Sequence, residues 1–156
     1  MEIERKFLLA ALPAGLEDSP GAAIEQGYLA FSDDGTEVRV RSKGGKHFLA
    51  VKHGGGLSRT EVELPVSAEQ FDALWPLTEG WRVSKVRREL PGPGGVTVEV
   101  DVYGGHLTGL WVAEVEFPDE AAAHAFTPPE WFGREITGDP AYRNRTVARH
   151  GLPQGA

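Results

Sequence analysis

Residues 1–7 read MEIERKF. The charged side chains of this stretch stand at alternate positions, Glu2, Glu4 and Lys6. Successive side chains of a β-strand point to opposite faces of the sheet, so these three would share one face. Ile3 and Phe7 would then lie on the other face. The stretch therefore predicts a strand with one charged face and one apolar face.

The same alternation of polar and apolar residues recurs along the chain. It occupies residues 2–9, 22–31, 37–43, 47–52, 59–64, 83–90, 96–103 and 111–117. Between these runs lie turn signals rich in Gly, Asp and Pro, such as DDGT, HGGGLS and PGPGG. Eight strands joined mostly by short turns predict an antiparallel sheet or barrel.

Three segments break the alternation and favour helices. Residues 67–77 begin with Ser67 as a predicted N-cap, followed by Gln70 at the capping-box position. The apolar residues of this segment fall on one stripe, Phe71, Leu74 and Trp75. Residues 119–126 begin with acidic residues, as a helix N-terminus favours. Residues 138–151 predict a turn and a short helix that ends near Gly151.

Length and composition limit the class of protein. The 156 residues carry a net charge of −7 and contain no cysteine. We expect a single domain over residues 1–156, cytoplasmic, and without disulfides or thiol chemistry. The acidic balance argues against general nucleic-acid binding, and no apolar run approaches a membrane span of roughly 20 residues. A small anionic substrate is the expected partner, and no oligomeric state is predicted.

Like-sign charges recur in pairs at two-residue spacing on the predicted strands. They are Arg39 and Arg41, Glu61 and Glu63, Lys85 and Arg87, Glu99 and Asp101, and Glu114 and Glu116. Such pairs sit about 7 Å apart. At that distance they repel by about 0.6 kcal/mol in water and about 2 kcal/mol at an effective dielectric of 20. Lys52 adds a further cation at the end of its strand.

Two interpretations follow from this pattern, and alternation alone does not decide between them. One is a sandwich whose charged face meets solvent. The other closes the sheet with its charged face inward, and helices carrying Phe71, Leu74, Trp75 and Phe126 cover the apolar outside. The like-sign pairs favour the second, because a surface that serves only solubility would mix the two signs.

A charged interior indicates its ligands by their chemistry. Arginine forks bind phosphate oxygens with two hydrogen bonds, and lysine adds a point charge. Mg²⁺ prefers a few carboxylates together with phosphate oxygens and water. Many carboxylates beside many cations therefore suit a metal-complexed oligophosphate better than phosphate or metal alone.

The ordered series of these motifs resembles the CYTH superfamily, also called triphosphate tunnel metalloenzymes. The likeness begins with EIERK and continues through RVR, VK, EVE, KVR, EVDVY and EVEF in family order. The tail WFGREITGDPAYRNRTVA is similar to the ending of short bacterial members. The resemblance covers nearly the whole chain and implies an eight-stranded antiparallel barrel whose tunnel binds triphosphate with Mg²⁺ or Mn²⁺.

The resemblance also implies roles for residues of this sequence. Phosphates would be held by Lys6, Arg39, Arg41, Lys52, Lys85 and Arg87. Metal would be held by Glu2, Glu4, Glu114 and Glu116, with Glu61, Glu63 and Asp101 assisting. Some members use a Lys–Tyr pair, which would fall on Lys85 and Tyr28 here. Tyr28 could then transfer a proton, its pKa lowered by Lys85, or could simply be a packed strand aromatic.

The function implied is a metal-dependent inorganic triphosphatase that cleaves tripolyphosphate to pyrophosphate and phosphate. Glu4 is the expected catalytic carboxylate, and Arg143 could reach a phosphate or cap the tunnel mouth. The alternatives within the family are a thiamine triphosphatase and a class IV adenylate cyclase. From a different class comes a non-catalytic module that binds polyphosphate or nucleotides.

Overall fold

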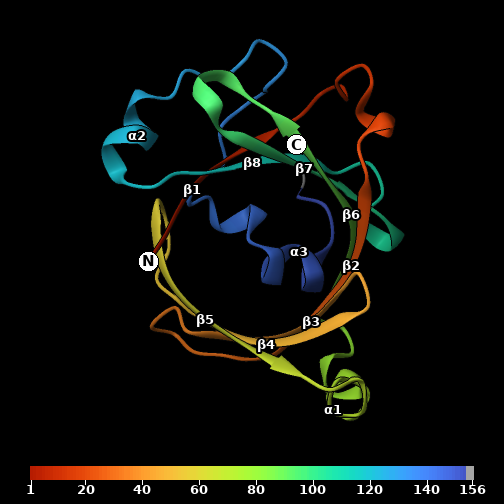
Figure 1. Cartoon of the computed structure of the whole chain (residues 1–156). Helices are drawn as coiled ribbons and strands as arrows, with labels where there is room; N and C mark the ends of the chain where they lie inside the picture. Colours follow the sequence, from red (N-terminus) through yellow and green to blue (C-terminus); the bar gives the residue numbers. More distant parts are fainter. Residues whose placement is uncertain (154–156) are drawn as a thin grey trace.

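The computed structural model describes residues 1–153, which form a closed eight-stranded antiparallel barrel (Figure 1). The strands are β1 (Glu2–Leu8), β2 (Gly21–Phe31), β3 (Glu37–Lys43), β4 (Lys46–His53), β5 (Ser58–Val66), β6 (Arg82–Pro91), β7 (Thr97–Tyr103) and β8 (Trp111–Glu116). Their order around the barrel is β1-β5-β4-β3-β2-β6-β7-β8. The predicted eight-stranded antiparallel barrel is confirmed, and closure excludes the open sandwich.

The helices are short. They are α1 (Ala68–Leu74), α2 (Glu120–Ala125) and α3 (Asn144–His150), with 3-10 turns at η1 (Leu16–Asp18), η2 (Trp75–Thr78), η3 (Pro93–Gly95), η4 (Gly105–Leu107) and η5 (Pro140–Tyr142). The capping box at the start of α1 forms as expected, since Ser67 accepts from the backbone of Gln70 and the Gln70 side chain accepts from Ser67. No helix within residues 1–153 is long and apolar enough to cross a membrane.

The barrel closes through only a short pairing between β1 and β5, and the C-terminal segment bonds to the rest of β1. These strands pair only at Glu2 with Arg59 and at Ile3 with Ser58. Beyond that point β1 bonds to the segment before α3. The backbone N–H of Ile136 donates to the carbonyl of Lys6 at 2.8 Å. The Lys6 N–H in turn donates to Thr137 Oγ1 at 2.9 Å.

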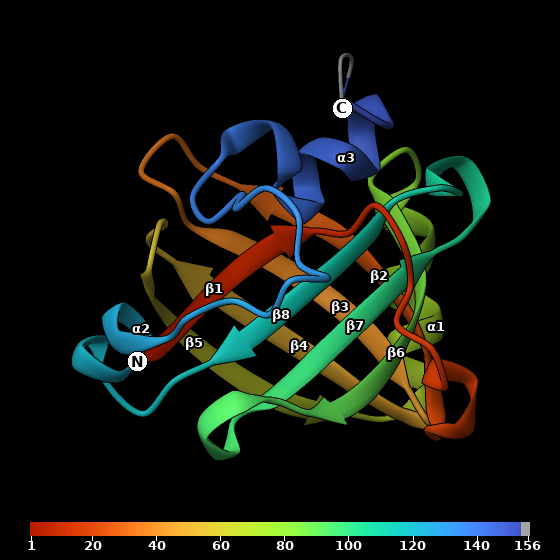
Figure 2. The same cartoon turned by 90° about the horizontal axis from the view of Figure 1, so that it is seen from above.

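One end of the barrel is filled by α3 and the turn before it. Figure 1 shows α3 within the ring of strands, and Figure 2 shows it at one end. Val147 and Ala148 of α3 pack with Val83, Tyr103 and Tyr142 in a buried apolar cluster. The inner face of the barrel is therefore charged along its middle and apolar at this end.

The outer face is covered unevenly. Phe126, after α2, packs on Phe117 and Phe7 with ring centroids 5.3 and 6.5 Å apart, which confirms cover on that side. Helix α1 packs Phe71 against His47 of β4, with 4.8 Å between ring centroids. Val62 and Leu64 of β5 are each 53 % exposed, so helices cover only part of the apolar outside.

Candidate active site

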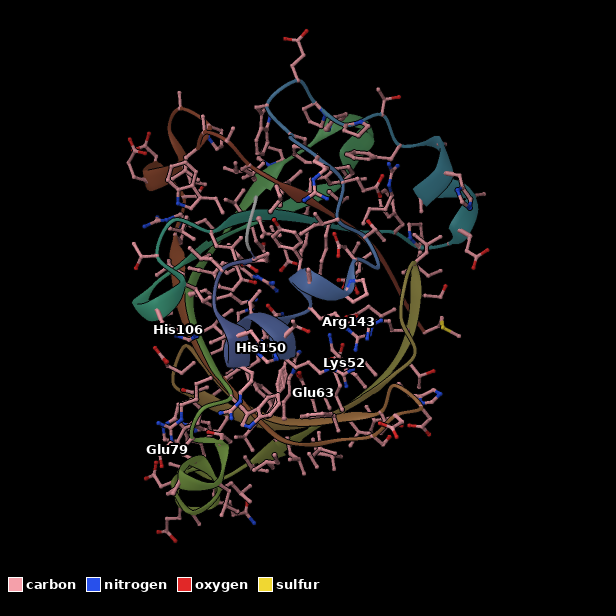
Figure 3. The ribbon with its side chains drawn as sticks, turned by 180° about the vertical axis from the view of Figure 1, so that it is seen from behind. Lys52, Glu63, Glu79, His106, Arg143 and His150 are labelled. Atoms are coloured by element: carbon pink, nitrogen blue, oxygen red, sulfur yellow. The ribbon has the colours of Figure 1, made fainter. Side chains whose placement is uncertain are left out.

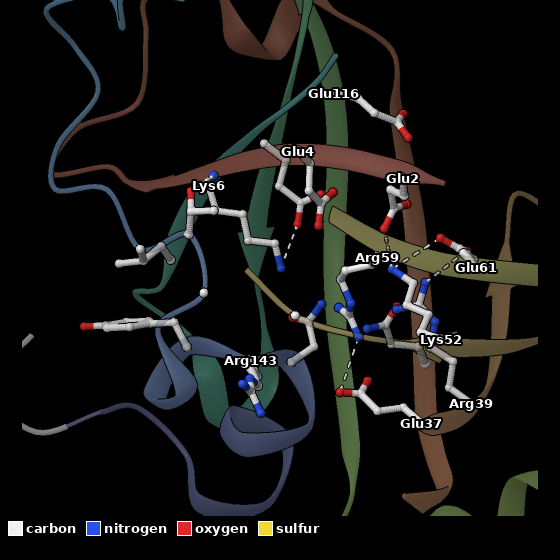
Figure 4. A pocket seen from close by; sticks show the side chains of 18 of the residues that line it. Glu2, Glu4, Lys6, Glu37, Arg39, Lys52, Arg59, Glu61, Glu116 and Arg143 are labelled. Atoms are coloured by element: carbon white, nitrogen blue, oxygen red, sulfur yellow. Dashed lines mark hydrogen bonds and ion pairs between the residues drawn. The ribbon is translucent and has the colours of Figure 1, made fainter. Parts of the chain in front are cut away.

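The inner face of the barrel encloses a cavity of about 220 Å³ (Figure 4). Nine basic and eight acidic side chains line it, so its lining carries a basic excess although the chain as a whole is at −7. Thirteen of the predicted site residues line it: Glu2, Glu4, Lys6, Tyr28, Arg39, Arg41, Lys52, Glu61, Lys85, Arg87, Glu114, Glu116 and Arg143. Figure 3 shows Lys52 and Arg143 within the ring of strands, whereas Glu79 lies outside it.

Two predicted metal residues do not line this cavity. Glu63 is exposed, although alternation places it on the same face as Glu61. Asp101 is fully buried behind the cavity wall, where it accepts hydrogen bonds from Lys85 Nζ at 2.8 Å and from Arg87 Nε at 2.7 Å. This placement suits a counter-charge that holds two cations, rather than the metal-assisting role implied by the resemblance.

The strands β1, β6, β7 and β8 carry one network of buried ion pairs. Arg87 donates to Glu114 at 2.9 Å and to Glu99 at 3.1 Å, besides its bonds to Asp101. Lys6 forms an ion pair with Glu114 at 3.2 Å. Burial favours the neutral acid, but the cations Lys6, Arg87 and Lys85 together hold the pKa of Glu114 well below its usual range. Glu114 is therefore a fixed negative charge.

A second network joins β1, β3, β4 and β5. Lys52 reaches Glu2 at 3.3 Å and Glu61 at 3.4 Å, and Arg39 approaches Glu61 at 3.8 Å. Figure 4 shows these side chains converging on the cavity from neighbouring strands. Burial lowers the pKa of Lys52, and the nearby Arg39 lowers it further. The two cations and two carboxylates of this network balance in formal charge, and burial makes the ionised form of Lys52 less favourable.

Arg41 is the clearest surplus cation. No carboxylate lies within ion-pair distance of it among residues 1–153, and its Nε has no hydrogen-bond partner there. Burial lowers the pKa of Arg41, and repulsion from Arg39 and Arg87 lowers it further. The Nε atoms of Arg39 and Arg59 are also buried without partners in the described chain. Unsatisfied buried donors of this kind call for an anionic ligand.

Glu2 and Glu4, the two carboxylates of β1, both have raised pKa values. Burial and a hydrogen bond with Glu61 raise the pKa of Glu2 to about 7. Burial and the charge of Glu114 raise the pKa of Glu4. Within residues 1–153 no three acidic or histidine side chains converge closely enough to hold an ion by themselves. These carboxylates thus fit a divalent cation that takes its remaining ligands from phosphate and water, as Mg²⁺ does.

Tyr28 and Lys85 both line the cavity, but the tyrosine paired in register with Lys85 is Tyr103. Lys85 pairs with Tyr103 across β6 and β7, with its Nζ 5.4 Å from the ring centroid. Tyr28 pairs instead with Arg39 on β3, and burial raises its pKa. The expected lowering by Lys85 is therefore wrong. Burial lowers the pKa of Lys85 itself to about 8, despite the charge of Asp101.

Several lining residues escaped prediction. On the strands they are Gln26, Glu37, Lys43, Arg59 and Glu99. The alternation of the strands could have predicted two of them, because Glu37 shares the face of Arg39 and Arg59 shares the face of Glu61. Glu37 is buried and pairs with Arg59 at 3.5 Å and with Arg145 at 3.7 Å. The segment 136–144 and the glycine loop 54–56 also line the cavity, and nothing in the sequence pattern indicates that they meet.

Comparisons with known proteins agree with this geometry. An inorganic triphosphatase of Nitrosomonas europaea is 47 % identical over 147 residues, covering 94 % of this chain and 96 % of that protein. One of Acetivibrio thermocellus is 40 % identical, covering 96 % and 94 %. A crystal structure of an inorganic triphosphatase matches with a TM-score of 0.74 and 42 % identity, over 98 % of this chain and 97 % of that one.

A more distant likeness concerns the fold alone. A structure of a Hippeastrum protein with a dominant triphosphatase activity is 16 % identical, with a TM-score of 0.58, over 80 % of this chain and 83 % of that one. No protein-family model matches the chain. The two bacterial relatives nevertheless align over almost the full length at 40 % identity or more. The chain therefore belongs to the CYTH superfamily and, within it, to the family of short bacterial inorganic triphosphatases.

Proposed function

We propose that this protein hydrolyses inorganic tripolyphosphate to pyrophosphate and phosphate with the help of Mg²⁺ or Mn²⁺. The observation that carries the proposal is the surplus of unpaired arginine donors, above all Arg41, around an enclosed cavity. The names of the two bacterial relatives support the same substrate. A linear chain of phosphates offers acceptor oxygens along its whole length and so suits a lining in which several strands contribute donors.

The cations of the chain would bind and orient the substrate. Arg39, Arg41 and Arg59 would donate to phosphate oxygens through N–H groups that have no protein partner in the described chain. Lys52, Lys85 and Arg87 would neutralise charge that moves toward the leaving oxygen as the bond breaks. Holding the chain in one orientation converts attack by water into a reaction between positioned groups.

The carboxylates would hold the cation. Glu2, Glu4, Glu114 and Glu116 line the cavity near β1 and β8, with Glu61 beside them. When bound, Mg²⁺ or Mn²⁺ would neutralise phosphate charge and make a bound water more acidic. The raised pKa of Glu4 makes it a better proton acceptor than an ordinary glutamate, which supports its predicted catalytic role. Lys85, with a pKa of about 8, suits proton donation to the leaving group.

The closed end of the barrel favours an unsubstituted phosphate chain over an organic triphosphate. The buried cluster around Val83, Tyr142 and Val147 fills the barrel at this end. It leaves no room there for a nucleoside or thiamine group attached to the phosphate chain. Tripolyphosphate could enter with either end first, whereas thiamine triphosphate and ATP could enter only with the free terminal phosphate toward this end.

Phosphate release tests this proposal directly. We expect rapid release from tripolyphosphate with Mg²⁺ or Mn²⁺, rates at least about 100-fold lower on ATP and thiamine triphosphate, and none with EDTA. Cyclic AMP should not form. Equal rates on ATP and tripolyphosphate would contradict a dedicated inorganic triphosphatase. Tight binding of tripolyphosphate without turnover under any of these conditions would support the non-catalytic module.

Glu4→Gln is expected to lower kcat on tripolyphosphate by about 100-fold or more without loss of stability. The side chain is buried and the charge of Glu114 opposes its ionised form, so an uncharged amide of the same shape should be tolerated. Steady-state kinetics and thermal unfolding measure both effects. Glu69→Gln, on the exposed side of α1, is the matched control and should change neither. Full turnover by Glu4→Gln would refute its assignment.

A further inference from the structure

Gln26 lies in the middle of β2 and is the one residue among residues 1–153 with two buried side-chain polar atoms that lack a hydrogen-bond partner. Its side chain is 1 % exposed, yet neither its amide nitrogen nor its amide oxygen has a hydrogen-bond partner within residues 1–153. Buried polar groups in native proteins are nearly always satisfied, and an orphaned amide is costly. A buried amide without a partner in the protein is therefore expected to hydrogen-bond to a ligand.

The neighbours of Gln26 place its amide at a boundary inside the barrel. Across the strands it pairs in register with Arg41 on β3 and with Val83 on β6. Arg41 is the surplus cation of the cavity, whereas Val83 belongs to the apolar cluster that closes one end. Gln26 lines the cavity at this junction. A ligand bound to Arg41 and stopped by the apolar cluster would meet the Gln26 amide.

We infer that Gln26 is a substrate-contact residue that recognises the terminal, unesterified phosphoryl group of a phosphate chain. Its Nε2 donates to an oxygen of that group, and its Oε1 accepts from a hydroxyl of the same group or from a water bound to it. A guanidinium or ammonium has only donors and cannot make the second bond, which gives the neutral amide a role that the surrounding cations cannot fill.

This inference rests on the proposed function for the identity of the ligand, and it adds a determinant of specificity. The end of the substrate that faces Gln26 abuts the buried Val83, so it must be the end of the chain rather than a bridging unit. An ester at that position would replace an oxygen with a carbon-bearing group and leave the amide unpaired. Sites that pair a buried polar group with the substrate reject analogues that lack the pairing atom.

The test compares Gln26→Met, nearly isosteric and apolar, with the wild-type protein. We expect the Tm of the ligand-free variant to equal or exceed that of the wild type, because two orphaned polar atoms are removed. We expect KM for tripolyphosphate to rise about tenfold, as for a lost hydrogen bond to a charged group. Gln26→Glu should raise KM further, by about 100-fold, because a carboxylate would face the phosphate.

Gln70→Met is the matched control, since Gln70 belongs to the capping box of α1 and lies outside the cavity. It should lower Tm and leave KM unchanged. A lower Tm with unchanged KM in Gln26→Met would instead show that Gln26 is structural, and unchanged values of both would also overturn the inference.

Binding without turnover separates this inference from the proposed function. With EDTA present, tripolyphosphate should raise the Tm of the wild type more than that of Gln26→Met. If the wild type binds but does not cleave tripolyphosphate, this difference still supports the contact while the proposed reaction fails. If the wild type cleaves tripolyphosphate and Gln26→Met matches it in KM and in this Tm shift, the reaction stands and the contact is wrong.

Discussion

Arg41→Ala is expected to lower kcat/KM for tripolyphosphate by about 100- to 1000-fold while leaving thermal stability unchanged or slightly higher. Arg41 has no carboxylate within ion-pair distance in residues 1–153, so its removal breaks no ion pair. Arg39 and Arg87 repel it in the ligand-free protein, and that repulsion ends with the substitution. The same charge is what would bind phosphate, so activity and stability should respond in opposite directions.

Steady-state kinetics and thermal unfolding of the same preparations measure both quantities. Arg88→Ala is the control, because Arg88 leaves the barrel wall on the outer side and donates to the carbonyls of Glu17 and Ser19. It should keep near-full kcat/KM. If Arg41→Ala retains full activity, or if it unfolds at a much lower temperature, Arg41 is not an unpaired phosphate ligand.

Asp101→Asn is expected to lower both stability and activity. Asp101 is fully buried and bonds to Lys85 and Arg87, so removal of its charge leaves two buried cations short of a counter-charge. Breaking a buried ion pair in this way costs about 3 kcal/mol of unfolding free energy. Without that carboxylate Lys85 would bind its proton less tightly and would contribute less positive charge at neutral pH. We expect turnover to fall by about 100-fold.

Denaturant unfolding gives the stability change, and kinetics measured well below the unfolding transition give the activity of the folded variant. Asp72→Asn on the exposed side of α1 is the matched control and should behave as the wild type. Unchanged unfolding free energy would contradict the role of Asp101 as the buried counter-charge. Loss of stability with full turnover would show that Lys85 and Arg87 do not need it for catalysis.

Alternation in the sequence was sufficient to predict which side chains share a face, whereas the like-sign pairs and the family resemblance indicated that this face lies inside a barrel. Each charged pair on β1, β3, β6 and β8 lies where its two-residue spacing puts it, because a closed sheet leaves a strand only two faces. Glu37 and Arg59 follow from the same alternation carried two residues toward the start of β3 and β5. It fails at Glu63, which is exposed, because alternation gives a face but not a depth along the barrel axis.

Register and the path of the C-terminal segment could not be predicted. Lys85 pairs with Ile24 on β2, four residues or about 13 Å along the strand from Tyr28. Register depends on turn geometry and long-range packing, so the tyrosine paired in register with Lys85 is Tyr103, whereas Tyr28 pairs in register with Arg39. The entry of α3 into the barrel depends on tertiary contacts of Val147 and Ala148, which resemble the buried face of any short helix.

We propose above all that the inward charges of the barrel form a binding site for a phosphate chain. A crystal structure of the protein grown with tripolyphosphate and EDTA, which prevents turnover, tests it most directly. We expect a phosphate chain inside the barrel, with oxygens within hydrogen-bond distance of Arg39 and Arg41 and one end at Gln26. Tripolyphosphate bound only on the outer surface, with the Arg41 guanidinium still without an anion, would contradict it.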